Sequence, residues 1–188
     1  MSEPQDFAFT AGTMQDSPAI FGPSSAELLI SEVLPILVAP RRYQPVQLTA
    51  TEQYGSQLAE YDVWANPLTG AWRAEDRNTG DLDSYDPATR EYRLAGELQE
   101  THPGQWGLEP EVVRLALPIT LGVWGRGTDP WRMVSAASTG EELLVTLRNT
   151  RDDHLLGSLT VSKRLEMVTR FDTPAGCIRY RDIESADG

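Results

Sequence analysis

The stretch from Glu142 to Ile183 constrains the fold of this chain more than any other part of the sequence. Its apolar residues recur at every second position, with polar residues between them: Leu143, Val145, Leu147, Leu159, Val161, Ile178 and Tyr180. Successive side chains of a β-strand point to opposite faces of the sheet, so each segment has one apolar and one polar face. This pattern is typical of an antiparallel sheet with one face covered and the other in water.

The same signals begin earlier in the chain, from Val46 onward. Short alternating segments are separated by turn sequences at Asn66 to Gly70, Asn78 to Gly80 and Asp86 to Thr89. Asn, Asp, Pro and Gly favour turns because they tolerate or preset the backbone angles that turns need. We therefore predict an up-and-down meander of strands, followed by a loop from Ala95 to Gly107.

Two helical segments are predicted to cover the apolar face. Ser24 and Glu27 form a capping box, and the apolar residues from Leu28 to Val38 recur at helical spacing. Pro35 lies inside this stripe, and we predict that the helix kinks or ends there, since proline lacks a backbone N–H and clashes with the preceding turn. A second short helix is expected to open with Glu109, Pro110 and Glu111, since proline suits the first turn of a helix and acidic residues favour its positive end.

These elements predict an α+β fold in which a few short helices cover a curved antiparallel β-sheet. The expected organisation is an N-terminal arm (1–23), a single domain (24–184) and a short tail (185–188). The chain has 188 residues, which fits one domain of this kind.

The net charge of −12 argues against nucleic acid and anionic membrane surfaces as partners. No apolar run reaches the roughly 18 residues of a membrane-spanning helix, so no stable membrane insertion is expected. The sequence as written begins without a secretory signal, which predicts a cytoplasmic protein, or an extracytoplasmic one if a signal was trimmed. The single Cys177 agrees with a reducing compartment.

Few residues carry the chemistry of an active site. His102 and His154 are the only histidines, and neither has ligands at metal-binding spacing around it. Cys177 would need a base brought to it by the fold, and no nucleophile elbow, phosphate loop or dinucleotide fingerprint is present. We expect no metal, no cofactor and no catalytic residue, and an enzyme such as a small hydrolase is the least favoured class.

Two short segments resemble the superfamily of lipoprotein carriers that includes LolA and LolB, with its RseB and LppX relatives. Gly80 to Pro87 is similar to the family's aromatic strand that ends in Tyr-Asp-Pro, and Phe171 to Gly176 is similar to its Asp-then-Gly turn. In element order the resemblance covers residues 25 to 183. It implies a half-barrel, a strongly bent sheet closed by helices over an apolar cavity, that binds acyl chains or protein segments without catalysis. Members of the family are normally exported.

The leading functional hypothesis is a non-catalytic binding protein for a hydrophobic small molecule or acyl chain. The residues predicted to line the site come from the apolar faces of the strands: Tyr61, Val63, Trp72, Tyr92, Trp131, Met133, Val145, Val161 and Met167. Core packing is the ordinary alternative for the tryptophans. The predicted lid is the first helix, with Leu29, Val33, Pro35 and Leu37. The alternative function is an acidic interaction module that docks a basic protein partner.

Overall fold

The computed structural model describes residues 23–38, 44–99 and 109–186. Its helical segments are α1 (Ser25–Leu28), a π-helical turn (Leu29–Val33), α2 (Leu34–Val38), α3 (Glu111–Arg114) and a 3-10 turn (Pro118–Thr120). The strands are β1 (Val46–Tyr54), β2 (Gln57–Asn66), β3 (Ala71–Asp76), β4 (Leu82–Asp86), β5 (Glu91–Leu94), β6 (Glu97–Gln99), β7 (Trp131–Ser138), β8 (Glu142–Asn149), β9 (Leu156–Ser162), β10 (Met167–Asp172) and β11 (Gly176–Ser185).

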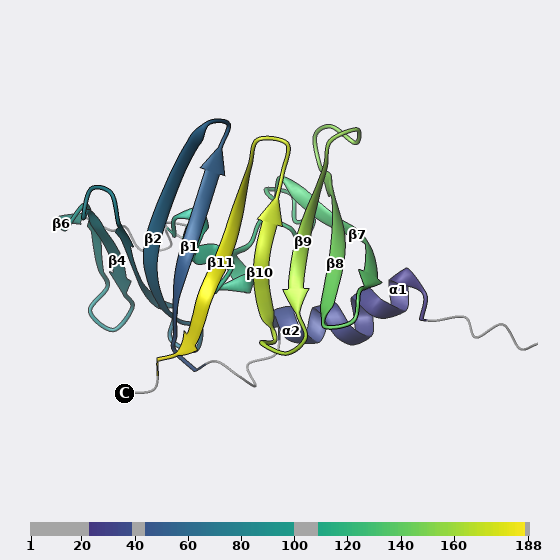
Figure 1. Cartoon of the computed structure of the whole chain (residues 1–188), viewed down its shortest axis with the longest axis horizontal. Coiled ribbons are helices and arrows are strands. Elements are labelled where there is room, and N and C mark those ends of the chain that lie inside the picture. Colours follow the sequence, from purple (N-terminus) through teal and green to yellow (C-terminus); the bar gives the residue numbers. More distant parts are fainter. Residues whose placement is uncertain (1–22, 39–43, 100–108, 187–188) are drawn as a thin grey trace, which may run out of the picture.

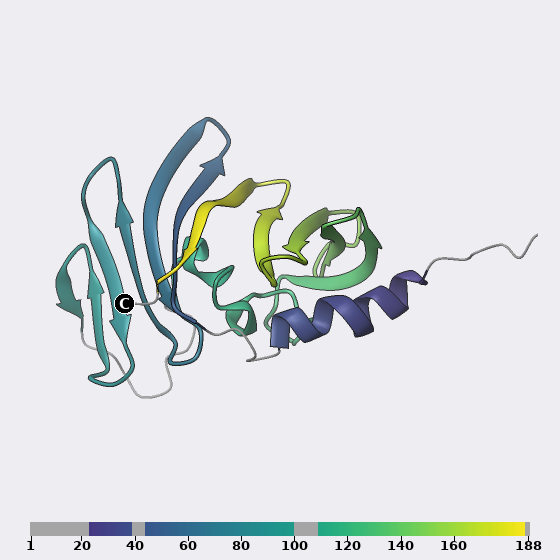
Figure 2. The same ribbon diagram turned by 60° about the horizontal axis from the view of Figure 1, so that its bottom comes forward.

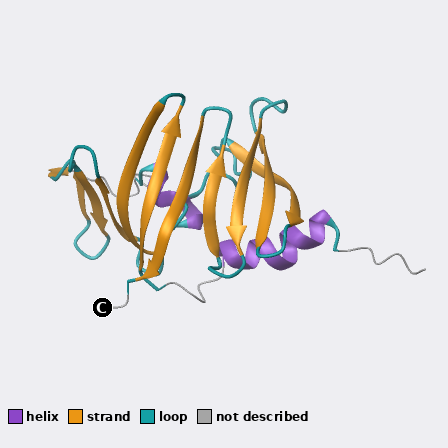
Figure 3. Cartoon of the chain, in the orientation of Figure 1, coloured by secondary structure: helices purple, strands orange, loops and turns teal. Residues whose placement is uncertain are grey.

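All described strands belong to one 11-stranded antiparallel sheet with the order β6-β5-β4-β3-β2-β1-β11-β10-β9-β8-β7. Two meanders meet where β1 pairs with β11, so the first and last strands lie side by side at the centre of the sheet (Figure 1). The sheet is open, curves around the helical segments (Figure 2) and keeps all the helices on one side (Figure 3). The predicted α+β fold with a curved antiparallel sheet and few helices is confirmed.

The concave face carries the hydrophobic core, as the alternation predicts. The alternating apolar residues of the C-terminal meander are buried, and Leu143, Val145 and Leu159 are 0% exposed. They share the core with the central strands through Ala50 and Ile178, and with the helices. The residues of opposite parity face solvent on the convex side.

The first helix runs without interruption from Ser25 to Val38 and passes through Pro35. The capping box is present, with Ser24 and Glu27 bonded to each other's backbone N–H groups. The turn before Pro35 is a π-helical turn in which the N–H of Leu34 donates to the carbonyl of Leu29. A wider turn accommodates a proline ring that a regular turn would not. The alternative that the helix ends at Pro35 is wrong, since the helix continues to Val38.

Two contacts join this helix to the sheet. The hydroxyl of Ser25 accepts a hydrogen bond (2.8 Å) from the backbone N–H of Ala136 on the edge strand β7. Lys163, in the turn between β9 and β10, pairs with Glu32 at 2.6 Å. The helix thus lies along the end of the sheet formed by β7 to β10 (Figure 2). None of the described helices has the length and hydrophobicity to cross a membrane.

The segment around α3 lies over the central strands and is held by one buried tyrosine. The hydroxyl of Tyr180 donates to the carbonyl of Val112 (2.5 Å) and accepts from the N–H of Ala116 (3.1 Å). Burial raises the pKa of this hydroxyl, so it stays neutral and can make both bonds. Tyr180 therefore fixes α3 on the concave face.

The structure has a strand within the predicted loop and a turn between β9 and β10. Part of the predicted loop is the strand β6, because Ala95 and Gly96 adopt positive φ angles of 49° and 79° and turn the chain back on β5. A turn with positive φ at both central residues matches the twist of a hairpin. The segment after Ser162 is a turn that joins β9 to β10.

Candidate binding surface

Five of the nine predicted lining residues lie inside the hydrophobic core of the concave face. Their side chains are 0–9% exposed and contact other core residues: Val63, Trp72, Trp131, Val145 and Val161. The predicted lid residues Val33 and Leu37 are fully buried in the same core, Leu29 is half-buried, and Pro35 is exposed. Beneath the first helix, the concave face is therefore packed with side chains of this chain.

The other four predicted lining residues are half-buried and pack against the core from its margin: Tyr61, Tyr92, Met133 and Met167. Two of them, Tyr61 and Tyr92, lie in the N-terminal meander, where α3 is the nearest described helix. We call the residues Tyr54, Tyr61, Trp72 and Tyr92 the aromatic surface. The rings of Tyr54, Tyr61 and Tyr92 remain accessible in part, whereas the ring of Trp72 is buried.

Register explains why these rings share one face. In β1, Glu52 and Tyr54 continue the parity of the buried Ala50, and Ala50 is opposite Tyr61 of β2. Trp72 of β3 is opposite Tyr85 of β4, which in turn is opposite Tyr92 of β5. The rings of Trp72 and Tyr92 meet edge to face, with centroids 6.2 Å apart.

Carboxylates surround the aromatic surface. Tyr54 donates to Glu111 of α3 at 2.5 Å, and Tyr61 donates to Glu52 at 3.5 Å. Burial raises the pKa of Glu52 above its ordinary value of 4.5, and the charge of Glu111 raises it further. These two carboxylates are thus close enough to repel each other in a partly desolvated position.

The hydroxyls respond to the same environment. Burial raises the pKa of Tyr54, and its hydrogen bond to Glu111 raises it further. Burial and nearby carboxylates also raise the pKa values of Tyr61 and Tyr92. The tyrosines are therefore neutral hydrogen-bond donors at physiological pH, within a negative potential.

Two buried polar atoms next to this surface have no hydrogen-bond partner among the described residues. They are the indole N–H donor of Trp72, on a side chain only 1% exposed, and the Oε2 acceptor of Glu109. A buried polar group without a partner costs about 1–3 kcal/mol. A ligand with both an acceptor and a donor would satisfy them.

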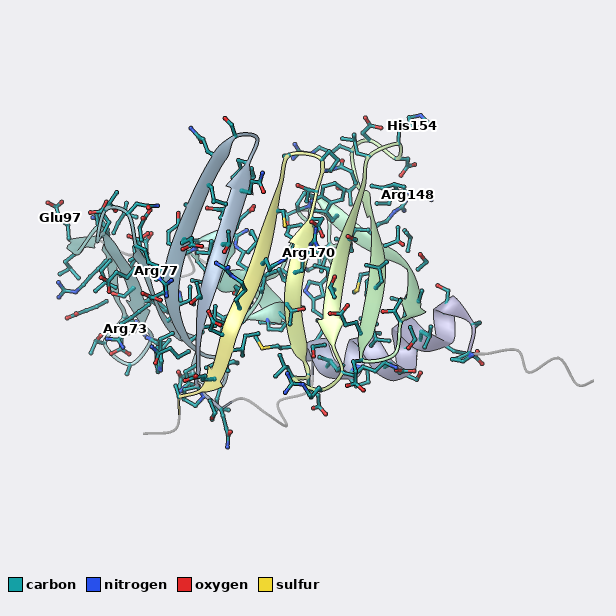
Figure 4. The ribbon with its side chains drawn as sticks, viewed as in Figure 1. Arg73, Arg77, Glu97, Arg148, His154 and Arg170 are labelled. Carbon is teal, nitrogen blue, oxygen red and sulfur yellow. The ribbon has the colours of Figure 1, made fainter. Side chains whose placement is uncertain are left out.

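The residues considered for catalysis lie elsewhere. His154 lies in the exposed turn after β8, where its backbone N–H donates to Asp152 (Figure 4). Cys177 lies on the convex face of β11, opposite Asp172, and burial raises its pKa, so the reactive thiolate is disfavoured. His102 lies outside the described residues. In the described ranges, no three His, Cys, Asp or Glu side chains are grouped closely enough to hold a metal ion.

The sequence analysis missed the carboxylates and Tyr54. The signal was present in β1, because the period of two that starts at Leu48 and Ala50 places Glu52 and Tyr54 on the apolar face. A carboxylate at such a position is predicted to lie on the same face of the sheet as the aromatic residues. Glu111 gave no such signal, since its place follows from how α3 packs on the sheet.

No family model matches the chain, and the search of curated proteins finds no match. Among solved structures, MucB matches with 18% identity and a TM-score of 0.41 over 89% of this chain and 62% of that chain. A complex of MucA and MucB from Pseudomonas aeruginosa matches with 18% identity and a TM-score of 0.38 over 82% of this chain and 56% of the other. This chain therefore spans about three fifths of the length of MucB.

A LolA superfamily protein from Nitrosomonas europaea matches with 9% identity and a TM-score of 0.33, over 89% of this chain and 96% of that one.

Proposed function

We propose that this protein is a non-catalytic binding protein that holds a hydrophobic ligand, such as an acyl chain, against the aromatic surface. The observation that carries the proposal is that Tyr61 and Tyr92 remain partly accessible at the margin of the core, on the same face as the buried Trp72. Binding sites are commonly lined by aromatic side chains with a few polar groups that fix orientation. The hydroxyls and the Trp72 N–H supply those groups.

The proposed site differs from the predicted one in its extent. Val145 and Val161 are predicted lining residues, but they lie beneath the helix at 0% exposure, and a ligand reaches them only if the helix moves. Tyr61 and Tyr92 are half-buried and need no such movement, and Tyr92 contacts the buried ring of Trp72. We therefore place the ligand on the aromatic surface and keep the helix as a proposed lid for the remainder of the concave face.

A titration with an apolar fluorescent probe tests this function. Tyr92→Ser removes a ring from the aromatic surface, and we expect it to weaken probe binding by about tenfold, which corresponds to about 1.4 kcal/mol. Leu144→Ser is the matched control, since Leu144 is 42% exposed on the convex face. Equal affinity in the wild type and in both variants would overturn the proposal.

The carboxylates favour a second candidate, an interaction module that docks a basic segment of a partner protein. Glu52, Glu109 and Glu111 lie around the aromatic surface, and Arg114 brings a positive charge near Tyr54. A lysine-rich peptide should bind the wild type at low salt and lose affinity at high salt, since exposed charges are screened. Salt-independent binding, or none, would remove this candidate.

A further inference from the structure

The convex face has a hollow of about 320 Å³ over the N-terminal meander. One row of its lining residues crosses β2 to β5 in register: Trp64, Arg73, Ser84 and Arg93. These residues have the opposite parity to Trp72 and Tyr85, so the row lies on the other side of the sheet from the aromatic surface. Trp72 and Tyr85 of the concave parity also contribute to the lining, so the hollow adjoins the aromatic surface, but its row of Arg73, Ser84 and Arg93 belongs to the opposite face.

Arg73 is held by an aromatic contact, and its guanidinium makes no hydrogen bond to another described residue. Its guanidinium carbon lies 5.6 Å from the ring centroid of Trp64. In the described part of the chain, no carboxylate pairs with Arg73, whereas Arg77 pairs with Asp62. Stacking on an indole orients a guanidinium and keeps its planar fork free to bind a carboxylate through two N–H groups.

The neighbours of Arg73 shape the hollow. Ala71 and Ser84 are short and form its floor, and the hydroxyl of Ser84 makes no hydrogen bond to a described residue. Arg93 is already bound to Glu91 at 3.2 Å and to the carbonyl of Gly96. Among the polar side chains of this row, Arg73 and the Ser84 hydroxyl thus keep donors for a ligand, and Tyr85 adds a further hydroxyl to the lining.

Two carboxylates limit the charge that the hollow tolerates. Asp86 and Glu91 both line it, and Asp86 accepts a hydrogen bond from the N–H of Ala88 in the following turn. They would repel a dianion such as phosphate more strongly than a monoanion. The apolar walls come from Trp64, Ala71 and Tyr85, and they favour a ligand with an apolar body.

We propose that the hollow binds a small aromatic monocarboxylate, with its carboxylate on Arg73 and Ser84 and its ring against Trp64. A volume of about 320 Å³ suits a ligand of this size, since ligand pockets begin at about 300 Å³. Arg73 lies on β3 at the far end of the sheet from His154 (Figure 4). Nothing in the proposal depends on the ligand of the concave face.

Titrations followed by amide chemical shifts of the ¹⁵N-labelled protein test the site, with benzoate, benzylamine and inorganic phosphate as separate probes. We expect millimolar benzoate to shift the amides of Arg73, Ser84 and Arg93 in a saturable way, and benzylamine and phosphate to bind more weakly. Arg73→Gln should weaken benzoate binding by about tenfold, because it removes the charged fork. Arg132→Gln is the matched control, an exposed arginine on β7 that pairs with Asp153.

The spectra also show whether each variant is folded, so a loss of binding is attributable to the site. The absence of saturable shifts in the wild type would overturn the proposal. So would equal benzoate affinity in Arg73→Gln and the wild type. Tighter binding of phosphate than of benzoate would contradict the assigned ligand class.

Discussion

The hydroxyl of Tyr180 makes two hydrogen bonds to backbone groups. It satisfies the carbonyl of Val112 and the N–H of Ala116, both buried where α3 meets the sheet. We predict that Tyr180→Phe lowers the free energy of unfolding by about 2–3 kcal/mol, since it leaves two buried backbone groups without a partner. Tyr85→Phe is the control, because the hydroxyl of Tyr85 bonds to no described residue.

Chemical denaturation of the two variants measures this effect. Equal stability of Tyr180→Phe and the wild type would show that α3 is held by packing alone. A selective loss in Tyr180→Phe would identify this hydroxyl as the attachment of α3, the helix that borders the aromatic surface.

Glu52 should make the stability of the protein depend on pH. Burial and the charge of Glu111 raise its pKa in the folded state above the ordinary 4.5. The fold therefore favours the protonated form: its contribution to stability is fully present below the unfolded-state pKa and is lost as the pH rises through the raised folded-state value. Glu52→Gln should remove this loss and be at least as stable as the wild type near neutral pH.

Urea midpoints measured between about pH 4 and pH 7.5 test the sign. The difference between Glu52→Gln and the wild type should grow with pH in this window. Glu97→Gln, an exposed carboxylate on the edge strand β6, is the control. Parallel curves for all three proteins would show that Glu52 does not titrate differently in the folded and unfolded states.

At the scale of elements, the central pair of strands depends on a glycine. Gly176 opens β11 opposite Tyr54, and a Cβ at this position would lie 2.4 Å from the carbonyl oxygen of Gln53. We predict that Gly176→Ala destabilises the protein by about 1–3 kcal/mol, because the two strands have to separate. Gly127→Ala is the matched control, since a Cβ there meets nothing within 4 Å. Equal thermal midpoints for the two variants would contradict this close approach.

A substitution of Pro35, which follows the π-helical turn, tests whether the first helix is a lid. Pro35→Ala restores a backbone N–H and should allow a regular α-helix, raising stability, since proline is about 3 kcal/mol less favourable than alanine inside a helix. If the helix opens at this turn, uptake of the apolar probe should change as well. Unchanged uptake and unchanged stability would leave Pro35 without a role in gating.

Much of the sheet could be predicted from the sequence because the period of two is a local signal. The buried faces of β8 and β9 follow directly from Leu143, Val145 and Leu159. The strand β6 could not be predicted in this way, since it requires a positive φ at Ala95, a residue that rarely adopts one. Of the proposed binding surface, Tyr61, Trp72 and Tyr92 could be predicted from the sequence, whereas Glu111 could not, because its position depends on tertiary packing.

At the scale of the whole molecule, the curved sheet has two differently covered halves. The first helix covers β7 to β10 with a packed core, whereas the shorter α3 borders the aromatic surface on β1 to β5. The concave face is therefore filled by buried side chains at one end of the sheet, and its aromatic side chains are partly accessible at the other. The central claim is that a hydrophobic ligand binds at the accessible half.

The most direct test of this claim is to map the bound apolar probe through amide chemical shifts of the ¹⁵N-labelled protein. The account predicts shifts in β1, β2, β3 and β5 around Glu52, Tyr61, Trp72 and Tyr92, and in α3, with β8 and β9 unchanged. Shifts confined to β8, β9 and the first helix would place the ligand beneath the helix and contradict the account. The absence of any saturable shift would contradict hydrophobic ligand binding altogether.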